Sequence, residues 1–194
     1  MKIQYLKTIR RSDFLKSLLL VLLFSIAGLM NAQSFTVGDL NYSVNSDGVS
    51  VTVTGHVDGT GAIGSLTIPE TVNYDENDYP VTRIGMNAFE HCDGLIGDLI
   101  IPNSVTKIEI AAFFGCVGFT GDLILPNSVV MIEDNAFGNC SGLTSLTLPD
   151  FVNDIGMDAF NGCTGITSFD IPSSVNYIGL RAFNGTGWYD AQPD

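Results

Sequence analysis

The sequence predicts a β-rich repeat solenoid with short helical turns. A phrase anchored on an Ile-Pro or Leu-Pro pair recurs five times, with its prolines at Pro69, Pro102, Pro126, Pro149 and Pro172. The steps between these prolines are 33, 24, 23 and 23 residues. An Ala-Phe pair recurs with the same period, and its rings are Phe89, Phe113, Phe137, Phe160 and Phe183. A period in the twenties that keeps its apolar positions is typical of stacked units that share one continuous core.

Each copy begins with a segment that is predicted to form a β-strand. Apolar residues alternate with other residues just before each proline, over residues 66–68, 99–101, 123–125, 146–148 and 169–171. This period of two is typical of strands, because successive side chains point to opposite faces. Proline then ends the strand, because it has no N–H group to donate to a neighbouring strand.

After the proline, a Val-x-x-Ile segment predicts a second short extended piece that turns two more apolar side chains inward. The Ala-Phe-x-x-Cys segment then predicts a tight helical turn, with Asn, Ser, Asp and Gly filling the remaining positions. Neighbouring strands in a stack lie about 4.8 Å apart, so equivalent residues form ladders. We therefore expect the five phenylalanines to stack through the interior.

Residues 33–65 do not fit the repeat and predict an N-terminal β-hairpin that caps the stack. Two β-rich runs, 35–44 and 49–57, are joined by Asn45–Gly48, which is a strong hairpin-turn signal. Five repeats then occupy residues 66–189, and the first carries an extra stretch around Tyr74–Pro80 that predicts a surface loop. At the other end, Trp188 and Tyr189 are expected to cover the last copy, with no polar capping helix before the tail 190–194.

Residues 1–32 predict a Sec-type signal peptide. Basic residues precede an apolar run from Leu18 to Met30, and Ala32 stands at a plausible cleavage position before Gln33. The run is short for a membrane span, which needs about 20 residues. We expect a secreted, cell-surface or periplasmic protein with no stable membrane span after cleavage. The alternative is a retained N-terminal anchor.

The remainder of the chain is strongly acidic. Without residues 1–32 it holds three basic residues against twenty acidic ones, a net charge of −17. Such a surface repels phosphate groups, which argues against nucleic acid and anionic lipid as partners. Acidity of this kind serves solubility, or it attracts basic patches on another protein or divalent cations.

The four cysteines, Cys92, Cys116, Cys140 and Cys163, share one repeat position, where the fifth copy has Thr186. Their spacing does not fit a C-x-x-C metal signature. Ladder neighbours are close enough in Cα separation for disulfides, but parallel side chains suit such a bridge poorly. We predict buried free thiols, since cysteine behaves as a small apolar residue in protein cores.

No catalytic, cofactor-binding or metal site is predicted. Only two histidines, His56 and His91, are present, so no Ser-His-Asp or Cys-His set can be assembled. The glycines punctuate turns and match no phosphate-binding loop. Asp98 and Asp122, each preceded by glycine, recur at one register and could hold Ca²⁺, although a turn before the strand explains them more simply.

The phrase L-x-I-P-x-x-V-x-x-I-x-x-x-A-F-x-x-C-x-x-L closely resembles the BspA-like leucine-rich repeat, found in surface proteins of gut and oral bacteria of the Bacteroidetes group. The resemblance extends over residues 35–189. It implies a right-handed, curved leucine-rich-repeat solenoid with a parallel sheet along one face. It also implies a secreted or surface location and a role in adhesion or host-protein binding.

One outward strand row is the predicted binding site. In the alternation it consists of Thr67, Ile100, Ile124, Thr147 and Asp170. Exposed apolar patches often mark partner sites, although β-propensity alone also explains isoleucine in a strand. We therefore predict a non-enzymatic, exported interaction protein that binds a host or bacterial surface protein. The alternative is a glycan-binding or glycan-handling accessory protein of the cell envelope.

Overall fold

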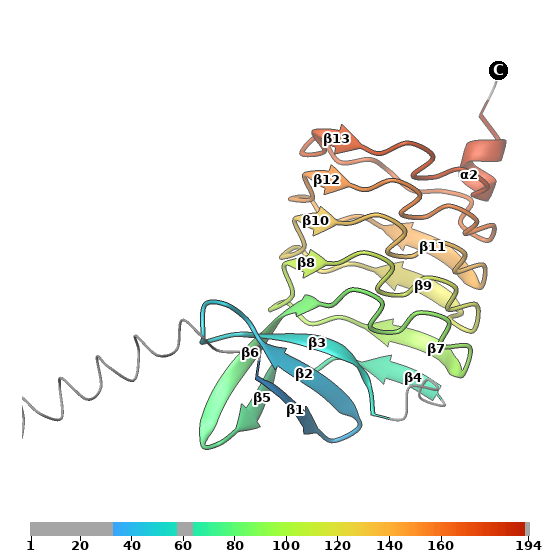
Figure 1. Ribbon diagram of the computed structural model, residues 1–194. Helices are drawn as coiled ribbons and strands as arrows, with labels where there is room; N and C mark the ends of the chain where they lie inside the picture. The colour runs from blue at the N-terminus through green and yellow to red at the C-terminus, as the bar shows by residue number, and fades with distance from the viewer. Residues whose placement is uncertain (1–32, 58–63, 193–194) are drawn as a thin grey trace, which may run out of the picture. The chain divides into compact units, whose positions relative to one another are not determined.

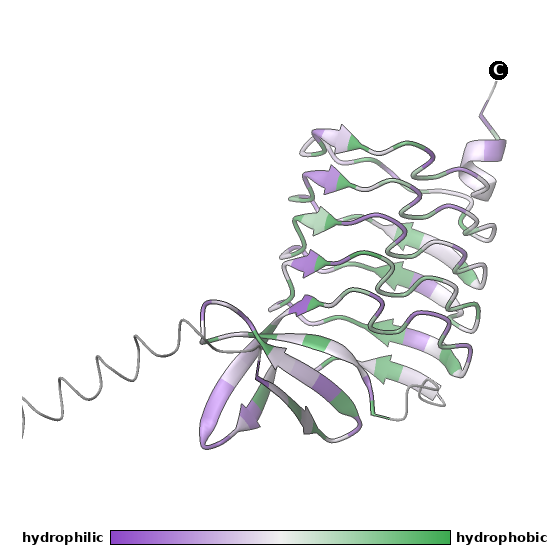
Figure 2. Cartoon of the chain, viewed as in Figure 1, coloured by the Kyte–Doolittle hydropathy of each residue, from purple (hydrophilic) through white to green (hydrophobic). Residues whose placement is uncertain are grey.

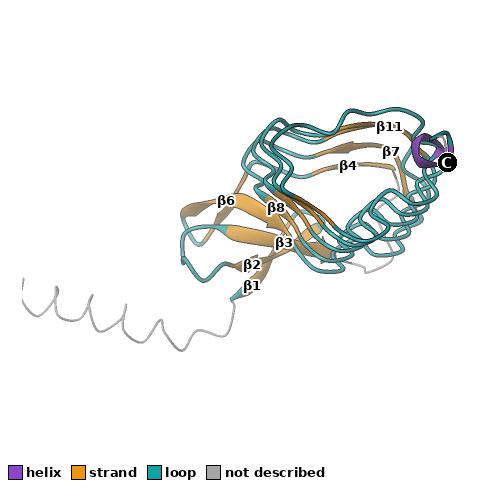
Figure 3. Cartoon of the chain, turned by 90° about the horizontal axis from the view of Figure 1, so that it is seen from above, coloured by secondary structure: helices purple, strands orange, loops and turns teal. Residues whose placement is uncertain are grey.

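The computed structural model describes residues 33–57 and 64–192, and the predicted signal peptide lies outside the described residues. Contacts separate Met1–Gln33 from one compact unit, Ser34–Asp194. In this unit the chain winds into stacked coils (Figure 1), and strands line two opposite sides of each coil (Figure 3). The unit therefore has the architecture of stacked repeats that the sequence predicts.

One side carries the strands that precede the prolines. They are β4 (Gly64–Thr67), β7 (Leu95–Ile100), β9 (Gly121–Ile124) and β11 (Leu143–Thr147). All pairings are parallel, but they form two separate two-stranded sheets, β4 with β7 and β9 with β11. A single bridge between Gly97 and Phe119 links the two sheets. Strands are therefore confirmed before four of the five prolines.

The predicted fifth strand at residues 169–171 is wrong. Phe169 stands where the other copies have leucine, and its ring packs against Phe183 and Trp188, with 4.6 Å between centroids in both pairs. The carbonyl of Ile166 accepts a hydrogen bond from the Trp188 N–H at 2.9 Å. The last copy therefore pairs with the C-terminal segment and not with β11.

The other side carries a continuous sheet. Short strands from each Val-x-x-Ile segment pair in parallel, namely β8 (Lys107–Ile108), β10 (Met131–Ile132), β12 (Asp154–Ile155) and β13 (Tyr177–Ile178). They extend a nine-stranded sheet whose order is β1-β2-β3-β6-β8-β10-β12-β13, with β5 paired to β6. The second extended piece of each copy thus forms the longer ladder of the molecule.

The N-terminal part is a three-stranded meander and not a single hairpin. The run 35–44 contains two strands, β1 (Ser34–Val37) and β2 (Leu40–Val44), because Gly38 adopts a φ of +59° between them. The predicted turn at Asn45–Gly48 does connect β2 to an antiparallel partner, β3 (Val51–His56). The Asp47 carboxylate accepts hydrogen bonds from the backbone N–H groups of Val49 and Ser50. β3 then pairs in parallel with β6 and so joins the meander to the repeats.

The extra stretch in the first repeat is a β-hairpin, so the predicted surface loop is wrong. β5 (Thr71–Tyr74) and β6 (Asn77–Ile84) pair antiparallel around Asp75 and Glu76, whose φ values are +50° and +61°. Positive φ at both central residues gives the turn a twist that matches the flanking strands. The hairpin was not predicted because its turn consists of two acidic residues, whereas such turns normally contain Asn or Gly.

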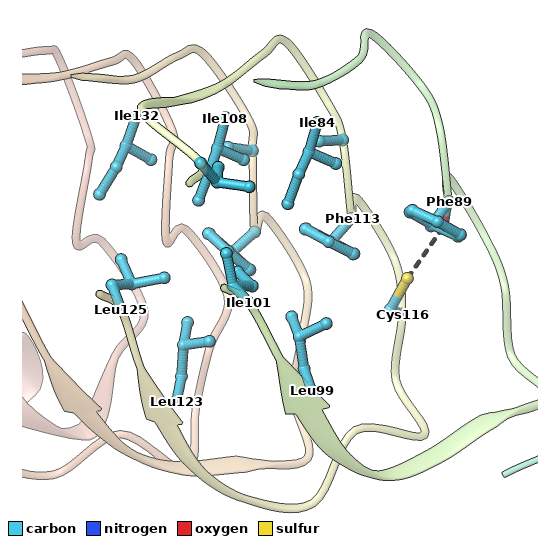
Figure 4. Packing of buried hydrophobic residues seen from close by; sticks show 14 of the residues in the cluster. Ile84, Phe89, Leu99, Ile101, Ile108, Phe113, Cys116, Leu123, Leu125 and Ile132 are labelled. Atoms are coloured by element: carbon cyan, nitrogen blue, oxygen red, sulfur yellow. Dashed lines mark hydrogen bonds between the residues drawn. The ribbon is translucent and has the colours of Figure 1, made fainter. Parts of the chain in front are cut away.

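The core lies between the two ladders, and apolar side chains from both sides meet there (Figure 4). The five phenylalanines stack in a continuous row, with 5.2 to 5.5 Å between successive ring centroids. Neighbouring coils are also joined at this row, because the N–H of each of the first four phenylalanines donates to the alanine carbonyl of the next coil, as from Phe113 to Ala136 at 2.8 Å. The predicted phenylalanine ladder is confirmed.

The helical turns are single hydrogen-bonded turns, as where the Cys116 N–H donates to the Phe113 carbonyl at 3.2 Å. Contrary to expectation, a short helix, α2 (Gly187–Asp190), follows the last turn. Thr186, which replaces cysteine in this copy, accepts a hydrogen bond from the Tyr189 N–H and so caps the helix. Among the described residues, no helix combines the length and apolar character that crossing a bilayer requires.

Candidate binding surfaces

The predicted binding row is present on four strands and absent from the fifth position. Thr67 pairs with Ile100 across β4 and β7, and Ile124 pairs with Thr147 across β9 and β11. All four are exposed, Ile100 by 52% and Ile124 by 63%. Asp170 is also exposed, but it lies outside any strand and has no pairing to Thr147.

The surface around this row contains further residues that the sequence did not assign to the predicted protein-binding site. Ile96 is 53% exposed, and Asp98 and Asp122 are exposed on the same outward faces of β7 and β9. We call the set Ile96, Asp98, Ile100, Asp122 and Ile124 the isoleucine face. Strand alternation could have identified these residues, because the period of two continues from Ile100 toward the N-terminus through Asp98 to Ile96.

A second exposed apolar surface lies on the nine-stranded sheet. Apolar residues two positions after the strand isoleucines are exposed, and they are Met86, Ile110, Met157 and Leu180. The residues just before those isoleucines also face outward, in the order Lys107, Met131, Asp154 and Tyr177 on successive strands. Figure 2 shows hydrophilic colour at the start of β8 and β12, with an apolar β10 between them. The predictions missed this surface because they assigned only inward positions to these segments.

The basic residues are engaged between coils. Arg83 lies 3.5 Å from Glu109, Lys107 lies 2.6 Å from Glu133, and Arg181 lies 2.8 Å from Asp158. These are the three lysine and arginine residues of the described chain, so each positive charge there has an acidic partner one coil away. The acidic residues in excess of these pairs give the unit its negative charge.

Several carboxylates also complete backbone hydrogen bonding. Glu109 accepts from the Met86 N–H at 3.3 Å, and Glu133 accepts from the Ile110 N–H at 3.1 Å. Asp134 accepts from the Met157 N–H at 2.7 Å. These carboxylates therefore connect neighbouring coils, which is a structural role.

The cysteines are buried free thiols, as predicted. The Sγ atoms of Cys116, Cys140 and Cys163 each donate to a phenylalanine carbonyl of the preceding coil, at 2.9 to 3.1 Å. Burial raises the pKa of Cys116 and of Cys163 to about 12, and it also raises the pKa of Cys140. A thiol with such a pKa is protonated at neutral pH and is a poor nucleophile.

Within residues 33–57 and 64–192, no three side chains of His, Cys, Asp or Glu lie together as metal ligands. One of the two aspartates considered for Ca²⁺, Asp122, accepts a hydrogen bond from Ser145 Oγ at 2.6 Å. The ring of His91 contacts Phe114 edge-on, with 5.3 Å between centroids. These contacts join neighbouring coils and belong to the packing of the stack.

The family model for the BspA type leucine-rich repeat region matches residues 82–190, in six copies. The chain belongs to this family. The resemblance seen in the repeat phrase is therefore confirmed. No curated protein matches the chain.

Solved structures of leucine-rich repeat proteins share the fold. A Bacteroides ovatus protein is 31% identical with a TM-score of 0.67, over 75% of this chain and 37% of that one. A Bacteroides capillosus protein is 25% identical with a TM-score of 0.53, over 75% of this chain and 97% of that one. A Eubacterium ventriosum protein is also 25% identical with a TM-score of 0.53, over 66% of this chain and 32% of that one. The chain thus spans little more than a third of the Bacteroides ovatus protein.

Proposed function

We propose that this BspA-type leucine-rich repeat protein is an exported, non-enzymatic interaction protein that adheres to a host or bacterial surface protein. The isoleucine face carries the proposal, because three isoleucines on adjacent coils are each more than half exposed there. Thr67 and Thr147 occupy the same row, so a strand at this position does not require isoleucine. Exposed apolar side chains bordered by polar residues are a common feature of protein-binding sites.

The proposal includes the organisation of the chain. Residues 1–32 direct export to the cell surface, the periplasm or the medium, residues 33–65 cap the stack, residues 66–189 form five right-handed repeats, and residues 190–194 are a tail. The antiparallel pairing of β1, β2 and β3 supports the cap, because it ends the parallel ladder with strands that do not belong to a repeat. A terminal unit of this kind shields the first repeat from solvent.

The non-enzymatic part of the proposal is supported by the state of the nucleophilic groups. The thiols are buried and protonated, and several carboxylates are held in hydrogen bonds between coils. Binding by surface contact needs neither a nucleophile nor a cofactor.

Glycan binding remains the second candidate because of three exposed aromatic side chains. Phe151 is 64% exposed, Tyr177 is 56% exposed and Tyr189 is 51% exposed. Exposed rings offer flat apolar surfaces on which sugar rings stack. The isoleucine face itself contains no aromatic residue, so the two candidates depend on different side chains.

The two candidates are separated by replacing Ile100 and Ile124 with lysine. Partner capture from host extracellular matrix should be lost, because two charges then stand in the centre of the apolar row. The double variant Val49→Lys/Val117→Lys adds the same charge at exposed turn positions and should bind as the parent does. Circular dichroism should show the same thermal midpoint for all three proteins. Unchanged capture would reject the isoleucine face, and a positive glycan array with no protein capture would favour the second candidate.

A further inference from the structure

A small hollow lies on the outward side of the nine-stranded sheet. Its volume is about 170 Å³, which gives room for one long side chain. The residues that form it are Ile110, Met131, Asp134, Asp154, Gly156 and Tyr177, together with Ile132 and Glu133. Met131, Asp154 and Tyr177 are direct neighbours on β10, β12 and β13, so a carboxylate stands between a thioether and an aromatic ring.

The carboxylates of this hollow differ in whether they have an ion-pair or hydrogen-bond partner. Glu133 is paired with Lys107 at 2.6 Å, and Asp134 accepts a hydrogen bond from the Met157 N–H at 2.7 Å. The side-chain carboxylate of Asp154 has no hydrogen-bond or ion-pair partner among the residues that the structure describes, and only its backbone N–H donates, to the Val130 carbonyl at 3.4 Å. It is therefore the carboxylate of the hollow that is available to a ligand.

We infer that this hollow binds a lysine or arginine side chain of a partner protein. The aliphatic stem of such a side chain packs against Ile110 and Met131, because long basic side chains bury their methylene groups along apolar surfaces. The charged head meets the carboxylate of Asp154, where a charge-assisted hydrogen bond forms. The ring of Tyr177 adds a favourable face for a cation.

Charge complementarity selects this occupant over others. The lysine and arginine residues of the described chain already have acidic partners, so no internal cation competes for Asp154. A neutral apolar side chain would remove water from Asp154 without replacing its hydrogen bonds, which is unfavourable. An acidic side chain would be repelled by three nearby carboxylates.

This inference rests on the proposed function, since it names the kind of side chain that a protein partner presents. It concerns the side of the coil opposite to the isoleucine face (Figure 3), so the two surfaces can be tested separately. A partner that contacts both would carry an apolar patch for one side and a basic segment for the other.

The test is calorimetric titration of the full chain with a blocked peptide of alternating lysine and leucine. Asp154→Asn should weaken binding about tenfold, because one charge-assisted contact is lost. Glu90→Gln removes the same charge at an exposed turn and should leave the affinity unchanged. A counterpart peptide with norleucine in place of lysine keeps the stem and should bind more weakly to the parent.

No binding of the lysine peptide, or equal weakening by Asp154→Asn and Glu90→Gln, would overturn the inference. Equal weakening would mean that the overall negative charge attracts the peptide without a specific site. The neutral variant Ile100→Thr/Ile124→Thr distinguishes the two proposals. It should reduce partner capture and leave peptide affinity intact. Unchanged capture would reject the isoleucine face, and reduced peptide affinity would reject the hollow as a separate site.

Discussion

Arg181 donates two hydrogen bonds to the carboxylate of Asp158, from Nε at 2.9 Å and from Nη2 at 2.8 Å. The two residues occupy the same repeat position on consecutive coils, and both have positive φ values, +58° and +55°. The full row at this position is Asn87, Ala111, Asn135, Asp158 and Arg181, all with positive φ. Asn and Asp tolerate this conformation, whereas other side chains resist it. The ion pair thus stabilises the last coil at Arg181, where the positive φ makes the backbone conformation unfavourable.

The Asp158–Arg181 pair predicts a pH-dependent contribution to stability. The hydrogen bonds from Arg181 hold the pKa of Asp158 below its usual value. Because the folded pKa lies below the unfolded value of about 4, ionised Asp158 stabilises the fold above that pH. This stabilisation is lost as the pH falls through the folded pKa. Urea denaturation should therefore show Asp158→Asn less stable than the parent at pH 7 and equal to it near pH 2. Glu90→Gln serves as the control, and a difference between Asp158→Asn and the parent that persists at pH 2 would contradict the prediction.

Among the residues of the positive-φ row, Ala111 is the one whose side chain is least suited to this backbone conformation. Its φ is +52°, and an alanine side chain crowds the neighbouring carbonyl there. Ala111→Asn should raise the free energy of unfolding by about 1 kcal/mol. The matched reverse change, Asn135→Ala, should lower it by a similar amount, since Asn135 has a φ of +57°. Chemical denaturation measures both, and the prediction fails if the two changes act in the same direction.

The phenylalanine ladder predicts a graded loss of stability along the stack. Phe137 stacks on Phe113 and Phe160, at 5.2 and 5.4 Å, and is fully buried. Phe137→Ala should lower the free energy of unfolding by about 3–5 kcal/mol. Phe183 has a repeat neighbour on one side and is covered on the other by Phe169 and Trp188, so Phe183→Ala should cost less. Equal shifts of thermal midpoint for the two variants would contradict the stacked arrangement.

The buried thiols predict a sharp contrast in alkylation. At pH 8 the native protein should resist iodoacetamide, because burial both shields the cysteines and raises their pKa. After denaturation without reductant, intact mass should show all four cysteines modified. Thiols that stay blocked in the unfolded chain would indicate disulfides and would contradict the structure.

Apolar periodicity was sufficient to predict the stack, its phenylalanine ladder and the buried thiols. These features repeat in every copy, so each copy supports the same inference. The first-repeat hairpin escaped prediction because Asp75 and Glu76 provide its turn in place of the usual Asn or Gly. The strand expected at residues 169–171 is absent, and the ring of Phe169 packs against Trp188, a residue that has no equivalent in the other copies.

The candidate surfaces were predicted only in part, for a related reason. Ile100 and Ile124 were found because strand alternation identifies outward positions before the proline. The hollow at Asp154 was not found, because it depends on which residues become neighbours across β10, β12 and β13. Pairing across coils brings together residues that are 23 positions apart, and no local sequence pattern predicts that these side chains form one site.

The change of period along the array has a consequence for how such chains vary in length. β9 and β11 pair with a register shift: Leu143 pairs with Gly121 and Ser145 with Asp122, so Thr144 has no partner on β9. Gly121, opposite this irregularity, has a φ of +94°, a conformation that glycine adopts readily. On the opposite side Ile132 still pairs with Ile155, in step. A single-residue insertion or deletion is thus confined to one side of one coil, and evolution can lengthen or shorten a copy there without moving its neighbours.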